Sequence, residues 1–351
     1  MSGVALITGG AGFIGSNLAD RLARQGRRVR VLDALNRPGV ERNLEWLKAS
    51  HGDRIEAVVG DVRDREVVDA AARGAEVVFH LAAQVAVTTS LADPVEDFEV
   101  NLKGTLNVLE AARTQGGLPV VFASTNKVYG DLGGVPLSLV DDAWAPLDDA
   151  MRRHGVDEEQ PLDFHTPYGC SKGAADQYAL DYARSFGLPA CVLRMSCIYG
   201  PRQMGTEDQG WVAHFLIRAL AGEPITLYGD GRQVRDILHV NDAVDAYLAA
   251  WSRMDAAAGR AFNLGGGPAN AVSLRQVLRH VESLIKRPVR IERADWRAGD
   301  QRYFVADAAQ AQAVLGLAPP REWRDGLADL ADWLRREHPA FASGRPAEAA
   351  A

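Results

Sequence analysis

The sequence has few cysteines, no long apolar run and no excess of positive charge. Its three cysteines, Cys170, Cys191 and Cys197, lack the spacing of metal-ligand pairs and form no even set for a disulfide framework, so we expect neither. The longest apolar stretch, around residues 77–87, is interrupted by polar side chains, which argues against a membrane partner. With 39 basic and 46 acidic residues the net charge is −7, which disfavours nucleic acid as a partner.

Length and composition indicate a folded chain with a sizeable core. The 351 residues are 47% hydrophobic and 24% charged, with only 16 prolines, which is typical of a globular protein and not of a disordered segment. At roughly 150 residues per domain, the chain has room for about two structural units. The amino terminus enters a strand-like run at Val4 without a basic region or cleavage site, so we expect a cytoplasmic protein.

The first two hundred residues alternate short apolar runs with amphipathic stretches. This pattern is typical of a parallel sheet with helices on both faces. The predicted fold class is therefore α/β, with a Rossmann-type doubly wound parallel sheet over residues 1–200. We expect its strands at about residues 4–8, 28–32, 55–60, 76–81, 119–124 and 189–195, and its helices at about 13–25, 64–73, 95–115 and 168–186.

Beyond Gly200 the elements become shorter and predict a second, smaller α/β unit over residues 201–338. The stretch 131–166 is rich in Pro, Asp and Gly, has one helical patch near 147–154, and is predicted to be a functional or mobile loop. The small, weakly patterned residues 339–351 are predicted to be a disordered tail. In the second unit we expect a strand at 225–228, a strand-like run at 262–264, and helices near 210–221, 273–286 and 322–336.

A glycine-rich run, Gly9-Gly10-Ala11-Gly12-Phe13-Ile14-Gly15, follows the first strand directly. Such glycines allow a tight turn and a close approach of backbone amides to a pyrophosphate at a helix amino terminus. Eighteen residues beyond Gly15, Asp33 ends the second strand, where its carboxylate would bind the adenosine ribose and repel a 2′-phosphate. The sequence therefore predicts NAD as cofactor, although Arg37 nearby would suit NADP.

Further candidate ligand contacts follow the third and fourth strands, at Asp61-Val62 and Leu81-Ala82-Ala83. Both stand at the carboxyl ends of predicted parallel strands, where open α/β sheets bind their ligands. Taken alone, these residues are equally well interpreted as ordinary turns.

A tyrosine and a lysine four residues apart form the candidate chemical site. Tyr168 and Lys172 share one helical face, 43 residues beyond Thr125 at the end of the fifth strand. The ammonium, together with a positive nicotinamide, would lower the phenol pKa from about 10 towards neutrality, so that Tyr168 acts as base while Lys172 also holds the cofactor ribose. The Thr125 hydroxyl would share the proton with the substrate oxygen.

Over about residues 4–336 the sequence resembles the extended short-chain dehydrogenase/reductase superfamily, in particular the NAD-dependent epimerase/dehydratase family. The likeness rests on Thr8–Gly15, on Thr125, Tyr168 and Lys172, and on Val234–Val240. It implies that residues 201–338 hold a sugar nucleotide, with Arg235 and Arg297 on phosphates or ribose and Tyr228 by the base. The residues that it implies for NAD binding are Gly9, Gly12, Phe13, Ile14, Asp33, Asn36, Arg37, Asp61, Val62, Leu81, Ala82, Ala83, Gln84, Asn101, Ser124, Tyr168 and Lys172. The residues that it implies for substrate binding are Val87, Thr89, Thr125, Asn126, Ser196, Gln209, Tyr228, Arg235, Arg297 and Gln301.

The two residues after Thr125 separate reactions within this family. Sugar 4,6-dehydratases carry Asp-Glu there, as acid and base, whereas this chain has Asn126-Lys127. An amide and an ammonium cannot take those roles. The resemblance then implies NAD-dependent epimerisation, in which a ring carbon is oxidised transiently and the hydride returns to the opposite face.

Longer runs, including residues 124–132, 162–178 and 208–212, are similar to the CDP-paratose 2-epimerase (CDP-tyvelose 2-epimerase) subfamily. This likeness implies oxidation at carbon 2 of a CDP-linked 3,6-dideoxyhexose, tightly held NAD, and a homodimer or homotetramer. Met195-Ser196-Cys197 departs from the subfamily pattern and predicts a changed sugar pocket. The alternatives are a 4-epimerase of a UDP-hexose or UDP-uronate and, in another class, a non-catalytic NAD-sensing module.

Four other side chains have structural interpretations. His80 and His239 are expected to be hydrogen-bonded structural histidines and not bases. Cys170 is expected to be buried packing within its helix. Trp211 either walls the substrate pocket or anchors the helix near 210–221.

Overall fold

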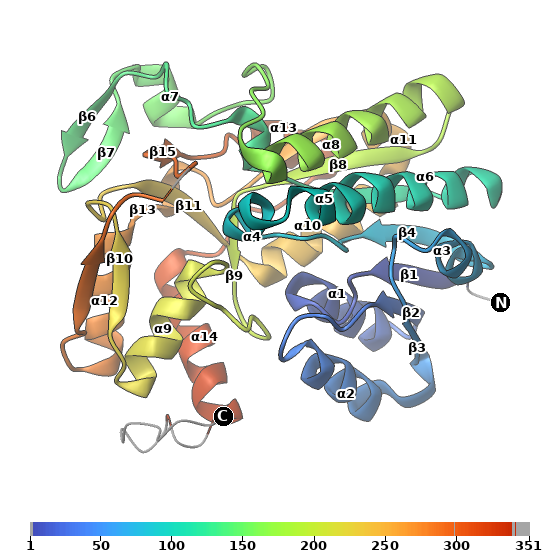
Figure 1. Ribbon diagram of the computed structural model, residues 1–351, viewed down its shortest axis with the longest axis horizontal. Coiled ribbons are helices and arrows are strands. Elements are labelled where there is room, and N and C mark those ends of the chain that lie inside the picture. The colour runs from blue at the N-terminus through green and yellow to red at the C-terminus, as the bar shows by residue number, and fades with distance from the viewer. Residues whose placement is uncertain (1–2, 298, 339–340, 342–351) are drawn as a thin grey trace.

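The computed structural model describes residues 3–297, 299–338 and 341. The other residues of the predicted disordered tail, 339–340 and 342–351, lie outside this description. The chain forms two units, and the second lies beside the carboxyl ends of the strands in the large sheet of the first (Figure 1).

The first unit contains a seven-stranded parallel sheet in the order β12-β8-β5-β4-β1-β2-β3. Its central strands are buried on both faces, because most residues along them are apolar and alternate residues enter different cores. The six strands predicted in this region are confirmed to within one residue at either end. The seven strands are β1 (Val4–Thr8), β2 (Arg28–Asp33), β3 (Ile55–Val59), β4 (Ala75–His80), β5 (Val120–Thr125), β8 (Ala190–Met195) and β12 (Ala261–Leu264).

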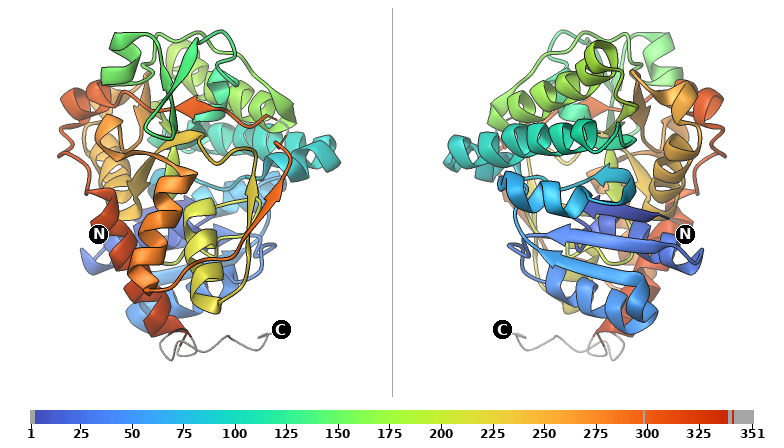
Figure 2. Two further views of the ribbon diagram at one scale, coloured as in Figure 1. Left: turned by 90° about the vertical axis from the view of Figure 1, so that its left-hand side faces the viewer. Right: turned by 90° about the vertical axis from the view of Figure 1, so that its right-hand side faces the viewer.

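Helices cover both faces of this sheet (Figure 2). Ala5 and Ile7 of β1 pack in one core with α1, α2 and α10, whereas Leu6 points the other way into a core with α3, α6 and α8. The predicted doubly wound fold is therefore confirmed. These helices are α1 (Phe13–Arg24), α2 (Val40–His51), α3 (Arg65–Ala72), α6 (Gly104–Thr114), α8 (Thr166–Phe186) and α10 (Val240–Ser252).

The helix predicted at 95–115 is not uniform. It begins as α5 (Pro94–Phe98), passes through one π-helical turn at η2 (Glu99–Lys103) and continues as α6. The short helix α4 (Val87–Ala92) precedes it and was not predicted, and neither was α2. The π turn matters because such turns often mark functional positions, and this one carries Asn101.

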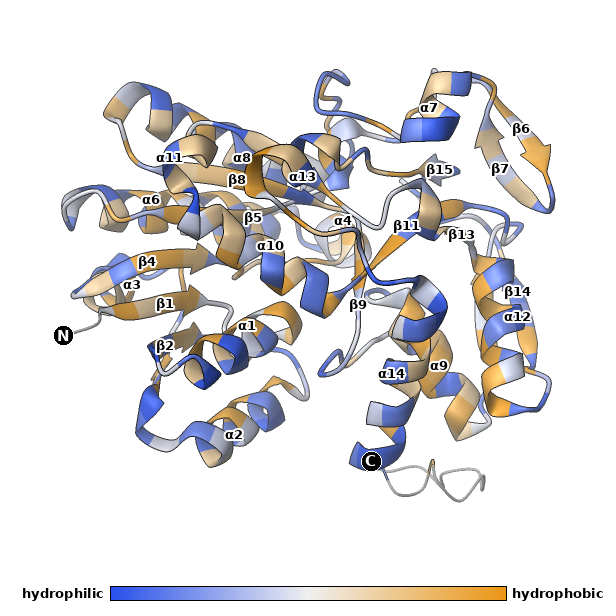
Figure 3. Ribbon diagram, turned by 180° about the vertical axis from the view of Figure 1, so that it is seen from behind, coloured by the Kyte–Doolittle hydropathy of each residue, from blue (hydrophilic) through white to orange (hydrophobic). Residues whose placement is uncertain are grey.

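The second unit is built on a smaller, four-stranded sheet of β9 (Cys197–Tyr199), β11 (Val234–His239), β13 (Ala271–Ser273) and β15 (Tyr303–Phe304). A separate parallel pair joins β10 (Ile225–Tyr228) to β14 (Ile291–Ala294). The helices of this unit carry both hydrophobic and hydrophilic residues (Figure 3). The hydrophobic side of each helix packs into a common core. The predicted helices are confirmed as α9 (Trp211–Ala221), α12 (Leu274–Ile285) and α14 (Trp323–Glu337).

One assignment is wrong: the run at 262–264 does not belong to the second unit. As β12 it pairs in parallel with β8, and α10 packs on the main sheet beside α1. The chain therefore crosses back to the first unit after residue 239, which the order of elements along the sequence does not reveal. The division into domains at residue 200 stays a prediction, with 240–264 contributing to the first unit.

The stretch 131–166 is more ordered than predicted. Its helical patch is confirmed as α7 (Asp149–His154), and an unpredicted hairpin of β6 (Leu137–Val140) and β7 (Ala143–Pro146) precedes it. The Trp144 indole nitrogen donates to Asp230 at 3.0 Å, and its amide donates to the Arg232 carbonyl at 3.0 Å. These bonds attach the insertion to the second unit. Within the described ranges, no helix is long and apolar enough to cross a membrane.

Candidate functional site

The glycine-rich loop lies at the carboxyl end of β1, where the strand order changes direction between β4 and β2. Gly9 has φ of +67°, and a Cβ there would stand 2.7 Å from the Ala82 amide nitrogen. A Cβ on Gly15 would stand 2.3 Å from the Gly9 carbonyl oxygen. Both glycines are therefore required by the close approach of backbone to backbone.

The amino terminus of α1 is open towards this loop. Gly12 occupies the N-cap position, so no side chain accepts from the first-turn amides. A helix end of this kind offers several N–H donors and a positive dipole to a phosphate.

Asp33, at the end of β2, supports the loop from the side. Its Oδ2 accepts from the Ala11 amide at 3.0 Å and its Oδ1 from the Leu35 amide at 2.9 Å. Asp61 follows β3, and the Arg63 guanidinium holds the pKa of that carboxyl below its usual value. A tight glycine turn, an uncapped helix end and a carboxylate on the next strand fit a dinucleotide without a 2′-phosphate.

The predicted cofactor residues gather at this same edge of the sheet. Phe13 and Ile14 begin α1, Asn36 and Arg37 follow β2, and Val62 follows β3. Of the others, Leu81, Ala82, Ala83 and Gln84 follow β4, Ser124 is near the end of β5, and Asn101 is in the π turn.

His80 is a structural residue, as predicted. Its two ring nitrogens lie 2.7 Å from Thr8 Oγ1 and 3.0 Å from Thr105 Oγ1 in a fully buried chain of hydrogen bonds. Burial, with the charge of Lys172, lowers its pKa to about 3, so that it stays neutral. His239 is also structural: its Nδ1 accepts from the Asn241 amide at the start of α10.

The candidate triad meets between β5 and α8. Thr125 ends β5, and Tyr168 and Lys172 stand one turn apart on α8 with their side chains buried. The Lys172 ammonium donates to the Ala123 carbonyl at 2.7 Å and lies 4.2 Å from the centre of the Phe122 ring. The strand end and the helix face thus bring a hydroxyl, a phenol and an ammonium together.

Burial is the largest influence on the ionisation of this pair. Burial raises the pKa of Tyr168 to about 12, and the nearby Thr125 hydroxyl lowers it only in part. Burial also lowers the pKa of Lys172 to about 7, against the opposing charges of Asp176 and Asp97. The lowering of the phenol pKa by the ammonium together with the nicotinamide charge stays a prediction.

A buried polar network behind the triad was not predicted. Asp97 is fully buried, and its two carboxylate oxygens accept from Ser171 Oγ at 2.5 Å and from Asn101 Nδ2 at 3.1 Å. Asn101 also pairs with the backbone of Gln84 through its carbonyl and amide groups, at 2.9 and 3.0 Å. The one sequence signal for this network is the acidic residue four positions before Asn101. That signal is weak, because surface helices often show such pairs.

Opposite the triad, three residues of the second unit approach the end of β5. Asn126 Nδ2 donates to Gln301 Oε1 at 3.2 Å, and the Lys127 ammonium donates to the Gly299 carbonyl at 2.9 Å. Arg235 donates to the Gln301 carbonyl at 2.6 Å and to Asp300 Oδ1 at 2.7 Å. The structure thus joins the predicted substrate residues Asn126, Gln301 and Arg235 in a series of contacts that begins at Thr125.

The surroundings of Lys127 alter the ionisation of its side chain. Burial and the nearby Arg235 lower its pKa to about 8, against the attraction of Asp300. At neutral pH the side chain is still mostly an ammonium. Its hydrogen bond to the Gly299 carbonyl uses the ammonium as a donor, and the position lacks the carboxylate described above for 4,6-dehydratases.

A second group of predicted substrate residues surrounds Tyr228 on β10. The Arg297 guanidinium lies 3.8 Å from the centre of the Tyr228 ring, and the Tyr228 hydroxyl donates to Glu207 at 2.6 Å. Gln209 lies in the same loop as Glu207. Gln233 joins this group to the first, because its amide donates to the Tyr228 carbonyl at 2.9 Å and to Asp300 at 3.3 Å.

The remaining predicted substrate residues are placed less directly. Val87 is near Gly299, while Thr89 is exposed on α4. Ser196 donates to Asp236 on β11, so its hydroxyl faces the second unit. The structure thus places these three around the edge of the two groups.

Two side chains near the site need separate comment. Cys170 is exposed on α8, so the expectation of a buried packing role was wrong: its position on the helix faces away from the sheet. Trp211 begins α9 and its indole nitrogen lies 3.4 Å from Cys197 Sγ. This contact favours the anchoring role for Trp211.

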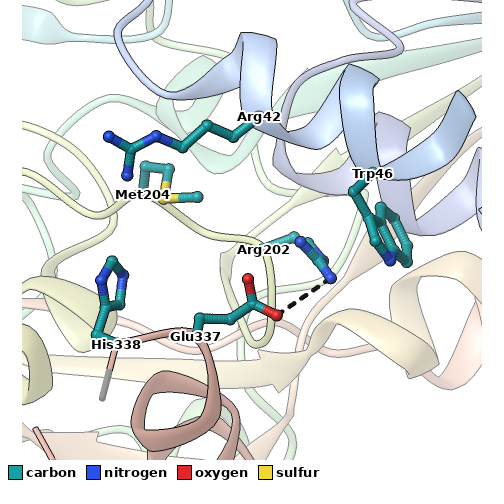
Figure 4. Close-up of a pocket in the computed structure, with 6 residues that line it drawn as sticks. All are labelled: Arg42, Trp46, Arg202, Met204, Glu337 and His338. Atoms are coloured by element: carbon teal, nitrogen blue, oxygen red, sulfur yellow. Dashed lines mark hydrogen bonds and ion pairs between the residues drawn. The ribbon is translucent and has the colours of Figure 1, made fainter. Parts of the chain in front are cut away.

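A separate cavity lies between α2 and the end of α14 (Figure 4). The Arg202 guanidinium lies 3.8 Å from the centre of the Trp46 ring and 3.4 Å from the Glu337 carboxylate. Asn17 and Asn43 donate to the carbonyls of Pro201 and Arg202. None of the predicted site residues lines this cavity, and its contacts fasten the loop after β9 to the first unit.

Comparison with known proteins gives consistent results. The model of the "NAD dependent epimerase/dehydratase family" matches residues 5–265. A CDP-paratose 2-epimerase of Salmonella typhi is 43% identical over 336 residues, covering 93% of this chain and 98% of that protein. A UDP-glucose 4-epimerase of Mycolicibacterium smegmatis is 34% identical, covering 95% and 98%. The Thermus thermophilus UDP-glucose 4-epimerase, solved in complex with NAD, has a TM-score of 0.80 and 33% identity, covering 95% and 99%.

Proposed function

This chain belongs to the NAD dependent epimerase/dehydratase family, and we propose that within it the protein is a CDP-paratose 2-epimerase that forms CDP-tyvelose. It is an NAD-dependent enzyme that acts on nucleotide sugars. The observation that carries the proposal is the placement of Asn126 and Lys127. An amide and an ammonium stand beside Thr125, where dehydration would need an acid and a base.

The identity of 43% to the Salmonella typhi CDP-paratose 2-epimerase supports the choice of substrate and ring carbon. The triad itself does not set the ring carbon, because Thr125, Tyr168 and Lys172 would serve a 4-epimerase equally well. A 4-epimerase of a UDP-sugar is therefore the outcome that would replace this proposal.

The residues present fit NAD at the carboxyl edge of the sheet. We propose that the backbone around Gly9 and Gly12 and the open end of α1 hold the pyrophosphate, and that Asp33 accepts from the ribose. Lys172 and Asn101 would support the nicotinamide half. When bound, NAD would supply the hydride acceptor and donor for transient oxidation of a ring carbon, with the hydride returned to the opposite face.

The triad residues would then remove one proton from the sugar and return it. We propose that Tyr168 removes the proton of the sugar hydroxyl at the carbon being oxidised and later returns it. Thr125, beside the phenol, would donate to the same oxygen and hold it in line. The Lys172 ammonium would favour the ionised phenol through its charge.

The two groups of predicted substrate residues suit two different parts of a nucleotide sugar. Around Arg235, bidentate donors suit the diphosphate, and around Tyr228 an aromatic ring and Arg297 suit the ribose and base. Gln209 and Gln301 would add hydrogen bonds at either end, with Val87, Thr89 and Ser196 on the rim. These roles are proposals for each residue.

We also propose that two copies associate through α5, α6 and α8. Large apolar side chains are exposed there, including Val95 and Phe98 on α5 and Tyr178 and Phe186 on α8. Static light scattering tests this surface: Phe98→Asp with Phe186→Asp should release monomers, while Leu147→Asp, on an exposed residue outside it, should not. The three free thiols suit a reducing compartment, and we propose the cytoplasm.

Turnover without added cofactor tests the function. Purified protein is incubated with CDP-paratose, and separately with UDP-glucose and UDP-glucuronate, while ring-proton couplings are followed by NMR. Formation of CDP-tyvelose without added NAD is the expected result. Turnover of a UDP-sugar alone, or a 4-keto-6-deoxy product, would overturn the substrate proposal while leaving the family assignment intact.

A further inference from the structure

The buried carboxylate of Asp97 is not used by the triad chemistry. It lies on α5, which packs against α8 (Figure 1), and its side chain is wholly removed from solvent. It accepts from Ser171 Oγ at 2.5 Å, and Ser171 directly precedes Lys172. A buried carboxylate is costly unless a charge nearby offsets the loss of water.

Asp97 differs in this respect from the other buried carboxylate near the triad. Asp176 forms an ion pair with the Arg194 guanidinium through two hydrogen bonds of 2.9 Å, although its charge also raises the pKa of Lys172. Asp97 has no ion pair within 4.0 Å among the residues that the structure describes. Its hydrogen-bond partners are the neutral Ser171 and Asn101. Burial raises the pKa of this carboxyl, and the Ser171 hydrogen bond and the charge of Lys172 lower it in part.

We propose that Asp97 is a positioning residue for the reaction, which acts through Lys172 by keeping a fixed negative charge beside the buried ammonium and phenol. The proposal rests on the function proposed above. Ser171 and Asn101 hold the carboxylate in place from α8 and from the π turn, respectively.

The charged neighbours of the pair are few. Asp97 faces it from α5, Asp176 with Arg194 from α8 and β8, and neutral His80 from β4. Asp97 raises the pKa of both Lys172 and Tyr168, because an anion favours the protonated form of each. Glu99 and Lys103 of the π turn pair with each other at 2.7 Å on the surface.

The sign of the effect gives a specific test. The Tyr168–Lys172 pair loses two protons in two steps, and its active form holds one. Removing the negative charge in Asp97→Asn lowers the pKa of both steps. Both limbs of the pH profile of kcat should therefore move together to lower pH, by about one unit, and the rate above the alkaline limb should fall about tenfold.

The controls separate charge from structure. Asp242→Asn makes the same change on α10, where that carboxylate accepts from the Arg321 amide. It should not move the limbs, and Asp97→Glu should keep them at their wild-type positions. If Asp97→Asn does not fold, Asp97→Ser removes the charge in a smaller side chain. The proposal would be overturned if kcat fell while both limbs of its pH profile stayed in place, or if the two limbs moved apart.

A second readout needs no sugar. The absorbance of the Tyr168 phenolate is titrated in the NAD-loaded protein, with Tyr168→Phe subtracted to isolate it. The midpoint should fall by about one unit in Asp97→Asn. If no sugar is turned over but this midpoint falls, the proposed function fails and the role of Asp97 stands; an unmoved midpoint contradicts that role directly.

Discussion

Asp176 and Arg194 form a buried, two-bonded ion pair that joins α8 to β8, with each hydrogen bond measuring 2.9 Å. Both side chains are removed from solvent, and Ser124 and Tyr129 complete their hydrogen bonding at 2.7 and 3.0 Å. Since α8 carries the candidate triad, this pair fixes the helix against the strand that lies beside Thr125. Its geometry links the stability of the fold to the shape of the site.

Breaking that pair from one side should be costly. Asp176→Asn keeps the shape but leaves the Arg194 charge buried and unpaired, so the free energy of unfolding should fall by about 3 to 5 kcal/mol in urea titrations. The double change Asp176→Leu with Arg194→Met removes both charges and should lose less than the single one. Asp181→Asn, which affects an exposed pair with Arg184 on the same helix, should cost under about 1 kcal/mol. Equal losses for the exposed and buried carboxylates would contradict this interpretation.

Tyr168→Phe should abolish the chemistry and spare the cofactor. The phenol is the only proton carrier proposed at the sugar oxygen, so we expect a loss of about 10²- to 10⁴-fold in kcat. The ring still fills its buried position, so NAD content after purification should match the wild type. Retained activity in this variant would point instead to a different base.

Gly9→Ala should release the cofactor. A Cβ at Gly9 would stand 2.7 Å from the Ala82 amide nitrogen in the loop where the pyrophosphate is proposed to bind. We expect about tenfold or greater loss of NAD affinity, measured by titration of the stripped protein. Gly26→Ala is the matched control: φ there is also positive, at +83°, but the added Cβ meets nothing within 4 Å. It should cost about 1 kcal/mol of stability and no NAD affinity.

Lys127 should make stability depend on alkaline pH. Its pKa is about 8 in the folded protein against an ordinary 10.5. Between these values the unfolded lysine still holds a proton that the folded one has lost, so raising the pH favours the folded state. Unfolding titrations should therefore show wild-type stability, taken relative to Lys127→Met, rising from about pH 8 to about pH 10.5. A flat difference over this window would mean that Lys127 is better hydrated than its surroundings indicate.

Local patterns predicted the main sheet well, because buried parallel strands are continuous apolar runs and the glycine loop has a distinct spacing. They placed β12 in the wrong unit, because its partner β8 lies some seventy residues earlier and strand pairing leaves no local trace. The hairpin β6–β7 was also missed: its two strands pair locally, but the Trp144 bonds that attach it to the second unit reach residues some ninety positions later.

The candidate site shows the same limit. Thr125, Tyr168 and Lys172 could be predicted because a four-residue spacing and a strand end are local features. Asp97 could not, since its proposed role depends on a helix packing against α8 and on hydrogen bonds to Ser171 and Asn101. The effect of burial on Tyr168, which raises the phenol pKa, could not be predicted because burial cannot be read from spacing.

The return of the chain to β12 has a consequence for how this protein is made. A ribosome that has released residues up to 200 has exposed six of the seven strands, but the outer edge of β8 still lacks its neighbour. That open edge could pair with another nascent chain until residues 261–264 emerge. Synthesis of β9 to β11 thus falls within the interval in which the first unit is incomplete, and the rest of the second unit, from β13 to α14, follows only after β12 has emerged.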